Sequence, residues 1–328
     1  MKKGSLLLSV VGLAALAGCS SNNIKINPDK EKYVVGIAQF VPHAALDAAT
    51  NGFKSKLTAL LTEAGRQVEY VETNAAGEVA NCPTIISSLV SKDVDLIMAN
   101  ATPCLSAAYT ATSTIPVLAT SITDYGVACE IEVVDGKTKT NVSGTSDLAP
   151  LDGQVSTMLE LLPSANKFGI VYSANEANSK FQVNEVKKHL EAAGKTVTTY
   201  PISGSEVLLS VCNAAAASED AIYIPTDNFC AENCETINPI FEGAHKPVFA
   251  GESGICKGCG FATLSIDYTR LGEITGEMAF NVLLGKEDIR EYAIKYDTDV
   301  KKLYVASRCS ALGIEIPANK GYEVLPLE

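Results

Sequence analysis

The chain has 328 residues, of which 47% are hydrophobic, and this is typical of a globular protein with room for two domains. Its formal net charge of −12 argues against a nucleic-acid partner, because nucleic acids bind basic surfaces. The sequence contains no tryptophan, so aliphatic side chains must build most of the core.

Residues 1–18 are predicted to be a signal peptide and not part of the fold. Two lysines precede an apolar run that is too short to span a membrane comfortably. Cys19 follows an Ala-Gly dipeptide, which resembles the lipobox of bacterial lipoproteins, where the cysteine is lipidated. Cleavage by an ordinary signal peptidase is the alternative. Residues 19–32 are polar and are predicted to be a tether, so we expect a lipid-anchored protein on the extracytoplasmic face of the cell membrane.

Strand-like and helix-like segments alternate from Tyr33 onward. The first series comprises strand 33–40, helix 43–65, strand 67–72, helix 79–92, strand 94–100, helix 103–112 and strand 115–120. Such alternation is typical of a mainly parallel sheet with helices on both faces. The sequence therefore predicts an α/β fold.

A second series repeats this order with similar lengths. It comprises strand 167–173, helix 179–194, strand 195–202, helix 205–218, strand 220–226, helix 227–244 and strand 246–252. Aligning Asp95 of the first series with Asp220 of the second places Thr102 opposite Asp227. A repeat of this length indicates two duplicated doubly wound lobes.

Three connecting segments are expected to form a three-strand hinge. They are residues 141–147, 260–268 and 289–309. The predicted lobes are therefore 33–146 plus about 265–293 for the first, and 147–264 plus about 294–328 for the second. Two lobes joined in this way can close on a ligand held between them.

Several segments resemble the solute-binding lipoproteins of a family of ABC importers. They are VGIAQFVPHAALDAATNGF, NATP, LPSANKFGIVYSANEANS, AIYIPTDN, PVFAGESG, FATLSIDYTRLGEITGEMA and LGIEIP. Some members of that family bind tryptophan, tyrosine or phenylalanine. The resemblance covers about Tyr33 to Pro317 and implies a type I periplasmic-binding fold. It also implies the delivery of a small solute, an amino acid with aromatic ones favoured, to an ABC permease. The sequence contains no convincing pair of nucleophile and base, so we expect a monomer without catalytic activity or cofactor.

Ligands of doubly wound sheets bind beyond the carboxyl ends of the strands. Candidate ligand-binding residues at these ends and at the hinge are Phe40, Thr102, Ser121, Asn175, Asn178, Thr226, Asp227, Asn228, Glu252 and Asp267. The hydroxyl groups of Thr102 and Ser121 are suited to the carboxylate of an amino acid. Asp227, with Glu252 as second choice, is suited to its ammonium. Phe40, Tyr125 and Tyr268 are suited to packing on the side chain of the ligand. An ordinary helix-capping role is the alternative for Thr102 and Asp227, and a hinge turn is the alternative for Asp267 and Tyr268.

Nine cysteines remain when Cys19 is set aside, so at least one thiol cannot pair within the chain. Cys230, Cys234, Cys256 and Cys259 are predicted to cluster at one edge of the second lobe. Disulfides or free thiols are favoured over a zinc site, because the spacing departs from known zinc patterns, and no metal is expected. A thiol–disulfide oxidoreductase using Cys256 and Cys259, or a ligand sensor with the same fold, are the alternative functions.

Overall fold

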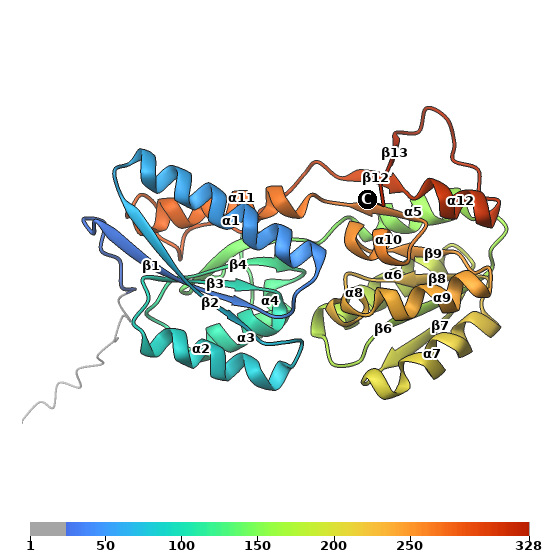
Figure 1. Ribbon diagram of the computed structural model, residues 1–328, viewed down its shortest axis with the longest axis horizontal. Helices are drawn as coiled ribbons and strands as arrows, with labels where there is room; N and C mark the ends of the chain where they lie inside the picture. The colour runs from blue at the N-terminus through green and yellow to red at the C-terminus, as the bar shows by residue number, and fades with distance from the viewer. Residues whose placement is uncertain (1–23, 328) are drawn as a thin grey trace, which may run out of the picture.

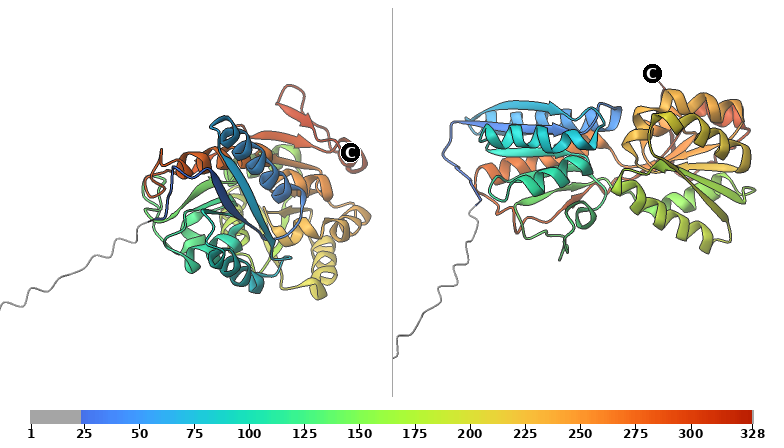
Figure 2. Two further views of the ribbon diagram at one scale, coloured as in Figure 1. Left: turned by 60° about the vertical axis from the view of Figure 1, so that its left-hand side comes forward. Right: turned by 90° about the horizontal axis from the view of Figure 1, so that it is seen from below.

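The computed structural model describes residues 24–327, which form two lobes arranged side by side along the long axis (Figure 1). Cys19 and the expected signal peptide lie outside the described residues. The described part of the expected tether is not free of the fold, because Ile24 and Ile26 pack against the core of the first lobe and Lys30 bonds Asp95 at 2.6 Å. Each lobe has its own sheet covered by helices on both faces, as Figure 2 shows from two further directions. The predicted α/β fold with two parallel-dominated sheets is confirmed.

The first lobe contains a six-stranded parallel sheet in the order β11-β5-β4-β3-β1-β2. Its strands are β1 (Lys32–Gln39), β2 (Gln67–Asn74), β3 (Leu96–Asn100), β4 (Val117–Ile122), β5 (Val142–Ser146) and β11 (Lys295–Tyr296). Every residue of β3, β4 and β5 is buried, because helices cover both faces of the sheet centre. This burial explains why β3 begins with four apolar residues and β4 with three.

Helices of the first lobe form two layers. The helical elements of this lobe are α1 (Ala44–Glu63), the 3-10 turn η1 (Val79–Asn81), α2 (Cys82–Ser91), α3 (Thr102–Ala111), α4 (Tyr125–Cys129) and α11 (Tyr268–Leu283). α1 and α11 lie on one face, and α2 and α3 on the other (Figure 1). A Cβ added at Gly272 of α11 would lie 2.0 Å from the Ala49 carbonyl oxygen of α1. This close approach requires glycine, and it fixes α11 to the first lobe although α11 follows the second lobe in sequence.

The second lobe contains a seven-stranded sheet in the order β13-β12-β10-β9-β8-β6-β7. Its strands are β6 (Lys167–Ser173), β7 (Thr196–Ile202), β8 (Ala221–Ile224), β9 (Val248–Ala250), β10 (Ala262–Ser265), β12 (Lys301–Tyr304) and β13 (Tyr322–Val324). Only the pair β10–β12 is antiparallel among the described strands.

One layer of helices in this lobe consists of α5 (Leu151–Leu161), α6 (Ala177–Ala192) and α12 (Ala306–Leu312). The opposite layer contains α7 (Ser205–Ser218), α8 (Asn228–Glu232), α9 (Cys234–Gly243) and α10 (Ser253–Gly258). The expected single helix 227–244 is therefore two helices that meet at Asn233. The short elements α4, α10, α12 and β13 do not appear among the helices and strands expected from the sequence.

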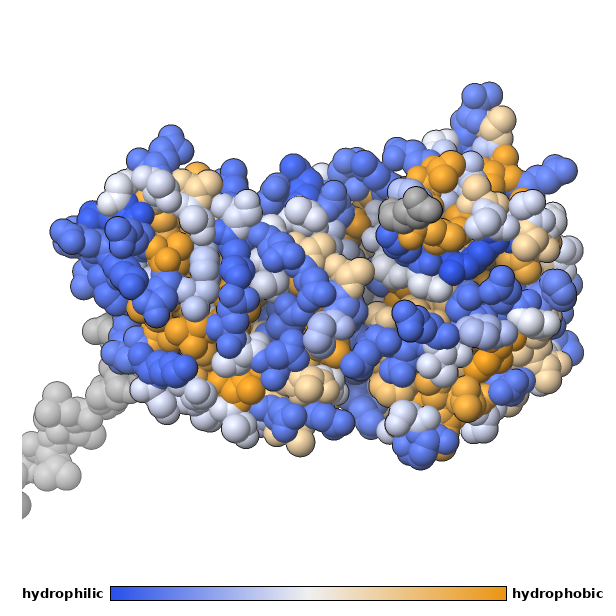
Figure 3. Space-filling model, viewed as in Figure 1, coloured by the Kyte–Doolittle hydropathy of each residue, from blue (hydrophilic) through white to orange (hydrophobic). Residues whose placement is uncertain are grey.

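The chain passes between the sheets three times: after β5, after β10, and between β11 and β12. The last strand of the first sheet ends at Tyr296. Figure 3 shows one face of the molecule, where polar residues predominate and apolar ones form scattered patches. Within residues 24–327, no helix combines the length and the apolar character needed to cross a membrane.

Candidate functional site

A narrow cavity with a volume of about 10 Å³ lies where the two lobes meet. The first lobe and its hinge helix contribute His43, Ala45, Leu46, Ser121, Thr123 and Tyr268. The second lobe and its hinge segment contribute Asp147, Asn178, Thr226, Asp227, Asn228, Ala231 and Glu252. Several of these residues follow the carboxyl ends of strands, where doubly wound folds bind their ligands.

Asp227 is both the N-cap of α8 and a cavity residue, and it is 1% exposed. One carboxylate oxygen accepts a hydrogen bond from the backbone N–H of Cys230 at 2.8 Å. The other accepts from the backbone N–H of Ser173 at 2.6 Å and from the Ser179 hydroxyl at 2.7 Å. The carboxylate therefore joins β6, α6 and α8 at the edge of the cavity.

Glu252 has a similar position at the start of α10. Its carboxylate accepts hydrogen bonds from the backbone N–H groups of Gly254 and Ile255. Burial nevertheless raises the pKa of this carboxyl group to about 7. Glu252, like Asp227, therefore caps a helix and also lines the cavity.

Asp147 supplies a third carboxylate, from the hinge segment that follows β5. It accepts hydrogen bonds from the Thr123 hydroxyl at 3.2 Å and the Tyr268 hydroxyl at 3.0 Å. Burial raises the pKa of Asp147 to about 6. Among the described residues that line the cavity there is neither lysine nor arginine, so the three carboxylates have no cationic partner there.

Glu176, in the loop before α6, determines how two of the cavity amides are oriented. Its carboxylate accepts from Nδ2 of both Asn178 and Asn228 and from the backbone N–H groups of Asn228 and Phe229. Burial and the neighbouring Asp227 raise the pKa of Glu176 to about 7. With their NH₂ groups bound in this way, both amides are left with Oδ1 for other partners.

The Oδ1 atom of Asn228 faces His43 of the other lobe, at 3.2 Å from Nε2. Because Oδ1 is an acceptor, Nε2 of His43 carries the hydrogen and Nδ1 is left as an acceptor. Burial lowers the pKa of His43, which also favours the neutral ring. This hydrogen bond connects the two walls of the cavity.

Three buried polar atoms of the cavity have no hydrogen-bond partner within residues 24–327. They are His43 Nδ1, Ser121 Oγ and Asn178 Oδ1. Leaving such a group unpaired costs about 1–3 kcal/mol. Ser121 also has a positive φ of 58°, at a register shift between β4 and β5. Strained backbone and unpaired polar groups together are typical of a binding site.

Residues 34–318 match the model of a protein family described as ABC transporter substrate binding protein. The chain belongs to this family. It is 32% identical over 291 residues to the tyrosine-binding protein of Clostridioides difficile strain R20291, covering 86% of this chain and 83% of that protein. The family consists of substrate-binding proteins, and they act outside the cytoplasm.

Solved structures of substrate-binding proteins are also similar to this chain. A Streptococcus pneumoniae ABC domain in complex with L-Trp has a TM-score of 0.82 at 30% identity, covering 88% of this chain and 99% of that one. The ligand-free, open structure of a substrate-binding protein with adhesive properties from Clostridium difficile has a TM-score of 0.67 at 31% identity. That match covers 89% of this chain and 99% of the other.

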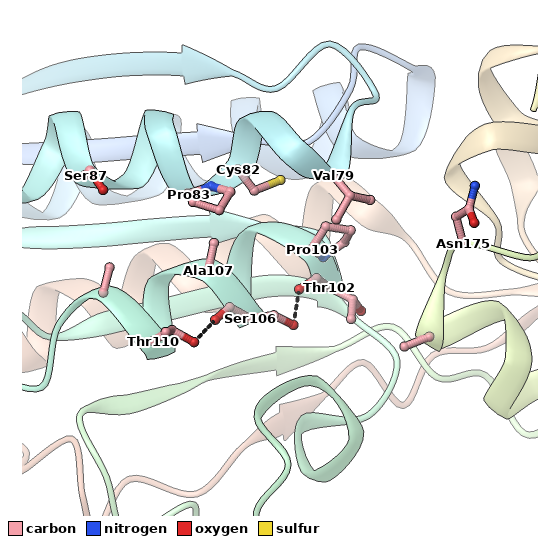
Figure 4. A pocket seen from close by; sticks show the side chains of 12 residues that line it. Val79, Cys82, Pro83, Ser87, Thr102, Pro103, Ser106, Ala107, Thr110 and Asn175 are labelled. Carbon is pink, nitrogen blue, oxygen red and sulfur yellow. Dashed lines mark hydrogen bonds between the residues drawn. The ribbon is translucent and has the colours of Figure 1, made fainter.

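Six of the residues selected from the sequence line the cavity of this substrate-binding protein: Ser121, Asn178, Thr226, Asp227, Asn228 and Glu252. The other four lie elsewhere. Thr102 and Asn175 lie on either side of a groove between the lobes, where Asn175 projects from the second lobe opposite α3 (Figure 4). Phe40 lines a neighbouring pocket between the lobes, and Asp267 caps α11 through the N–H groups of Thr269 and Arg270.

Three cavity residues were not predicted to contact the ligand: His43, Thr123 and Asp147. Tyr268, which was expected to pack on the side chain of the ligand, also lines the cavity. Glu176 behind the cavity was also not selected. A sequence signal exists for Asp147, since it ends the first hinge segment directly after a strand of small polar residues. No comparable signal marks Glu176, because its role depends on a loop that folds back onto α8.

All nine described cysteines are free thiols. The Sγ atoms of Cys234 and Cys259 lie 3.7 Å apart, which confirms the predicted approach of these two pairs of cysteines. Within residues 24–327 no group of three or more histidine, cysteine or acidic side chains is placed to hold a metal ion. The alternative function as a thiol–disulfide oxidoreductase is not favoured, since Cys256 is fully buried and burial raises its thiol pKa.

Proposed function

We propose that this substrate-binding protein binds an amino acid with an aromatic side chain between its lobes and delivers it to an ABC permease. The observation that carries the proposal is the cavity itself, where three carboxylates meet without a cationic side chain. An α-ammonium group would supply the missing positive charge and up to three hydrogen-bond donors. The tyrosine-binding relative and the tryptophan-bound structure support an aromatic amino acid as the ligand.

The polar atoms without partners support the same ligand group. With the side chains oriented as they are, His43 Nδ1 and Asn178 Oδ1 are both acceptors, and an ammonium is a donor only. The Ser121 hydroxyl can donate and is suited to the ligand carboxylate. We therefore place the ammonium among Asp147, Asp227 and Glu252, and the carboxylate near Ser121. The apolar side chains of Ala45 and Leu46 complete the wall.

The arrangement of the lobes is the one expected for the ligand-bound state. The TM-score is higher for the tryptophan-bound structure than for the open, ligand-free one, although both are about equally identical to this chain in sequence. The His43–Asn228 hydrogen bond requires closed lobes, because it joins their facing walls. Opening at the hinge would break this bond and expose the carboxylates to water.

Attachment to the membrane is a separate part of the proposal. Cys19 is lipidated and holds the protein, as a monomer, at the extracytoplasmic face of the cell membrane. The Ala-Gly-Cys motif after an apolar run and the polar segment that follows it support this statement. Cys19→Ala should release the protein from the membrane fraction or leave its signal peptide uncleaved. An unchanged mass and unchanged fractionation would contradict lipidation.

A thermal-shift screen with the common amino acids tests the proposed ligand class. A ligand at 100 times its dissociation constant stabilises a protein by about 2.7 kcal/mol. We expect tyrosine, tryptophan or phenylalanine to raise the melting temperature most. A screen in which no amino acid shifts the melting temperature, or in which only sugars or anions do, would contradict the proposal.

A further inference from the structure

Two pairs of cysteines have their sulfur atoms in contact, one pair in each lobe. The Sγ atoms of Cys82 and Cys104 lie 3.9 Å apart, and those of Cys234 and Cys259 lie 3.7 Å apart. All four side chains are buried. A disulfide needs an S–S distance of about 2.05 Å, so each pair must close by less than 2 Å to form one.

We propose that Cys82–Cys104 and Cys234–Cys259 are sites of disulfide formation, each oxidised by a low-molecular-weight disulfide. The first bridge would connect the first residue of α2 with the first turn of α3. The second would connect the first residue of α9 with the C-cap of α10. Each bridge stays within one lobe, so neither one crosses the cavity or prevents the lobes from opening.

One cysteine of each pair lies at a cavity through which a small oxidant can approach. Cys82 lines the groove between α2 and α3, where Figure 4 shows its side chain next to Val79 and Pro103. Cys259 lines a separate cavity in the second lobe, together with Phe241 and Arg308. In the first pair Cys104 lies deeper than Cys82 and acts as the resolving thiol. In the second pair both side chains are similarly buried, and Cys234 is the resolving thiol because only Cys259 of the two lines the cavity.

The reaction balances with the oxidant as the acceptor of two electrons. The thiolate of Cys82 attacks the small disulfide, forms a mixed disulfide and releases one thiolate. The thiolate of Cys104 then attacks the Cys82 sulfur and releases the second one. Two protein thiols thereby lose two protons and two electrons, and the oxidant becomes two thiols. Contact with the Cys104 thiol lowers the pKa of Cys82, whereas the same contact and burial raise the pKa of Cys104.

A disulfide stabilises a protein mainly by restricting its unfolded chain. The two bridges would close loops with sequence separations of 22 and 25 residues. An exported protein meets conditions in which such bridges persist. We therefore expect the oxidised protein to melt at a higher temperature than the reduced one, and a reductant to reverse this difference.

Peptide mapping of the full-length chain in detergent tests the inference. The folded protein is incubated with oxidised glutathione, unfolded without reductant, alkylated and digested. We expect two linked peptide pairs, Cys82 with Cys104 and Cys234 with Cys259, while Cys129 and Cys212 are alkylated. These two control cysteines are buried free thiols as well.

Alkylation of all four cysteines to the same extent as the two controls would overturn the inference, and so would glutathione adducts without linked peptides. If only one pair is linked, the inference fails for the other pair. The double variant Cys82→Ser, Cys234→Ser should lose the redox-dependent shift in melting temperature. A shift that persists in this variant would contradict the assigned pairs. Ligand binding enters neither readout, so this test is independent of the proposed function.

Discussion

The Tyr268 hydroxyl donates a hydrogen bond of 3.0 Å to Asp147, and this bond joins two hinge segments beside the cavity. Asp147 follows β5 at the first passage between the lobes, and Tyr268 begins α11 after the second passage. The carboxylate is therefore held where the lobes rotate against each other. A charge in this position can be sensitive both to the ligand and to closure of the lobes.

Tyr268→Phe removes this hydrogen bond and leaves the aromatic ring in place. A hydrogen bond to a charged group contributes about 1.5–3 kcal/mol, so we expect ligand affinity to fall by about tenfold or more. The matched control is Tyr125→Phe, whose buried hydroxyl bonds the carbonyl oxygens of Ala119 and Thr145 outside the cavity. Calorimetric titration should show weaker binding in the first variant only. Equal losses of ligand affinity in the two variants would mean that the Tyr268 hydroxyl affects binding only by stabilising the fold.

Asp227→Asn tests a carboxylate that has two roles. An asparagine still caps α8, but its NH₂ group cannot accept from both Ser173 N–H and the Ser179 hydroxyl, as the second carboxylate oxygen does. We expect the free energy of unfolding to fall by about 1–3 kcal/mol and binding to weaken strongly. Asp124→Asn is the control, since Asp124 caps α4 through the N–H of Val127 outside the cavity. Unchanged ligand affinity in Asp227→Asn would show that Asp227 is a cap and nothing more.

Glu176→Gln addresses the orientation of the two cavity amides. In the parent, one carboxylate oxygen accepts from Asn178 and Asn228 and the other accepts from the Phe229 N–H group. A glutamine has only one accepting oxygen, so either the two amides or the Phe229 N–H group loses its partner, and the orientation of the amides is no longer fixed. Ligand affinity should fall although residue 176 does not line the cavity. The control Glu219→Gln changes another buried glutamate of the second lobe, which accepts from Tyr200. If both variants bind ligand as the parent does, the orienting role of Glu176 is wrong.

Ligand affinity should depend on pH, because the ammonium requires ionised carboxylates. The pKa values of Asp147 and Glu252 in the ligand-free protein are raised to about 6 and about 7. Both groups lose their charge as the pH falls through these values, whereas the ligand ammonium stays protonated. Affinity should therefore decrease between about pH 8 and about pH 5, and binding near neutral pH should release protons.

Titration calorimetry in buffers with different ionisation enthalpies measures this proton release directly. Asp147→Asn removes the group that titrates near pH 6 and leaves Glu252 and Glu176, whose pKa values are raised to about 7, so it should reduce the number of protons released near pH 6. An affinity that stays constant across this range, with no proton release, would contradict an ammonium bound by these carboxylates.

The strand-end rule predicted much of the site from the sequence. It selected Ser121, Thr226, Asp227 and Glu252, because the carboxyl ends of β4, β8 and β9 meet at the same cavity. The repeated strand and helix pattern likewise predicted most elements of both sheets. Local periodicity and turn residues carry this information, since each element forms largely from its own sequence.

The remaining features depend on contacts between distant segments. Glu176 lies 52 residues from Asn228, and nothing in its own segment indicates that the two side chains bond. Asp147 and Tyr268 are 121 residues apart and meet only because the chain passes twice through the hinge. A sequence also cannot separate a capping aspartate from a ligand-binding one, and Asp227 has a position suited to both roles.

The most direct test of the ammonium site changes the ligand and leaves the protein intact. Tyrosine and tryptophan are titrated calorimetrically beside their desamino analogues, in which a hydrogen replaces the ammonium group. If Asp147, Asp227 and Glu252 bind the ammonium, the analogues should bind weaker by about 100-fold or more, because the buried carboxylates lose their partner. Analogues that bind as tightly as the amino acids would contradict the central claim.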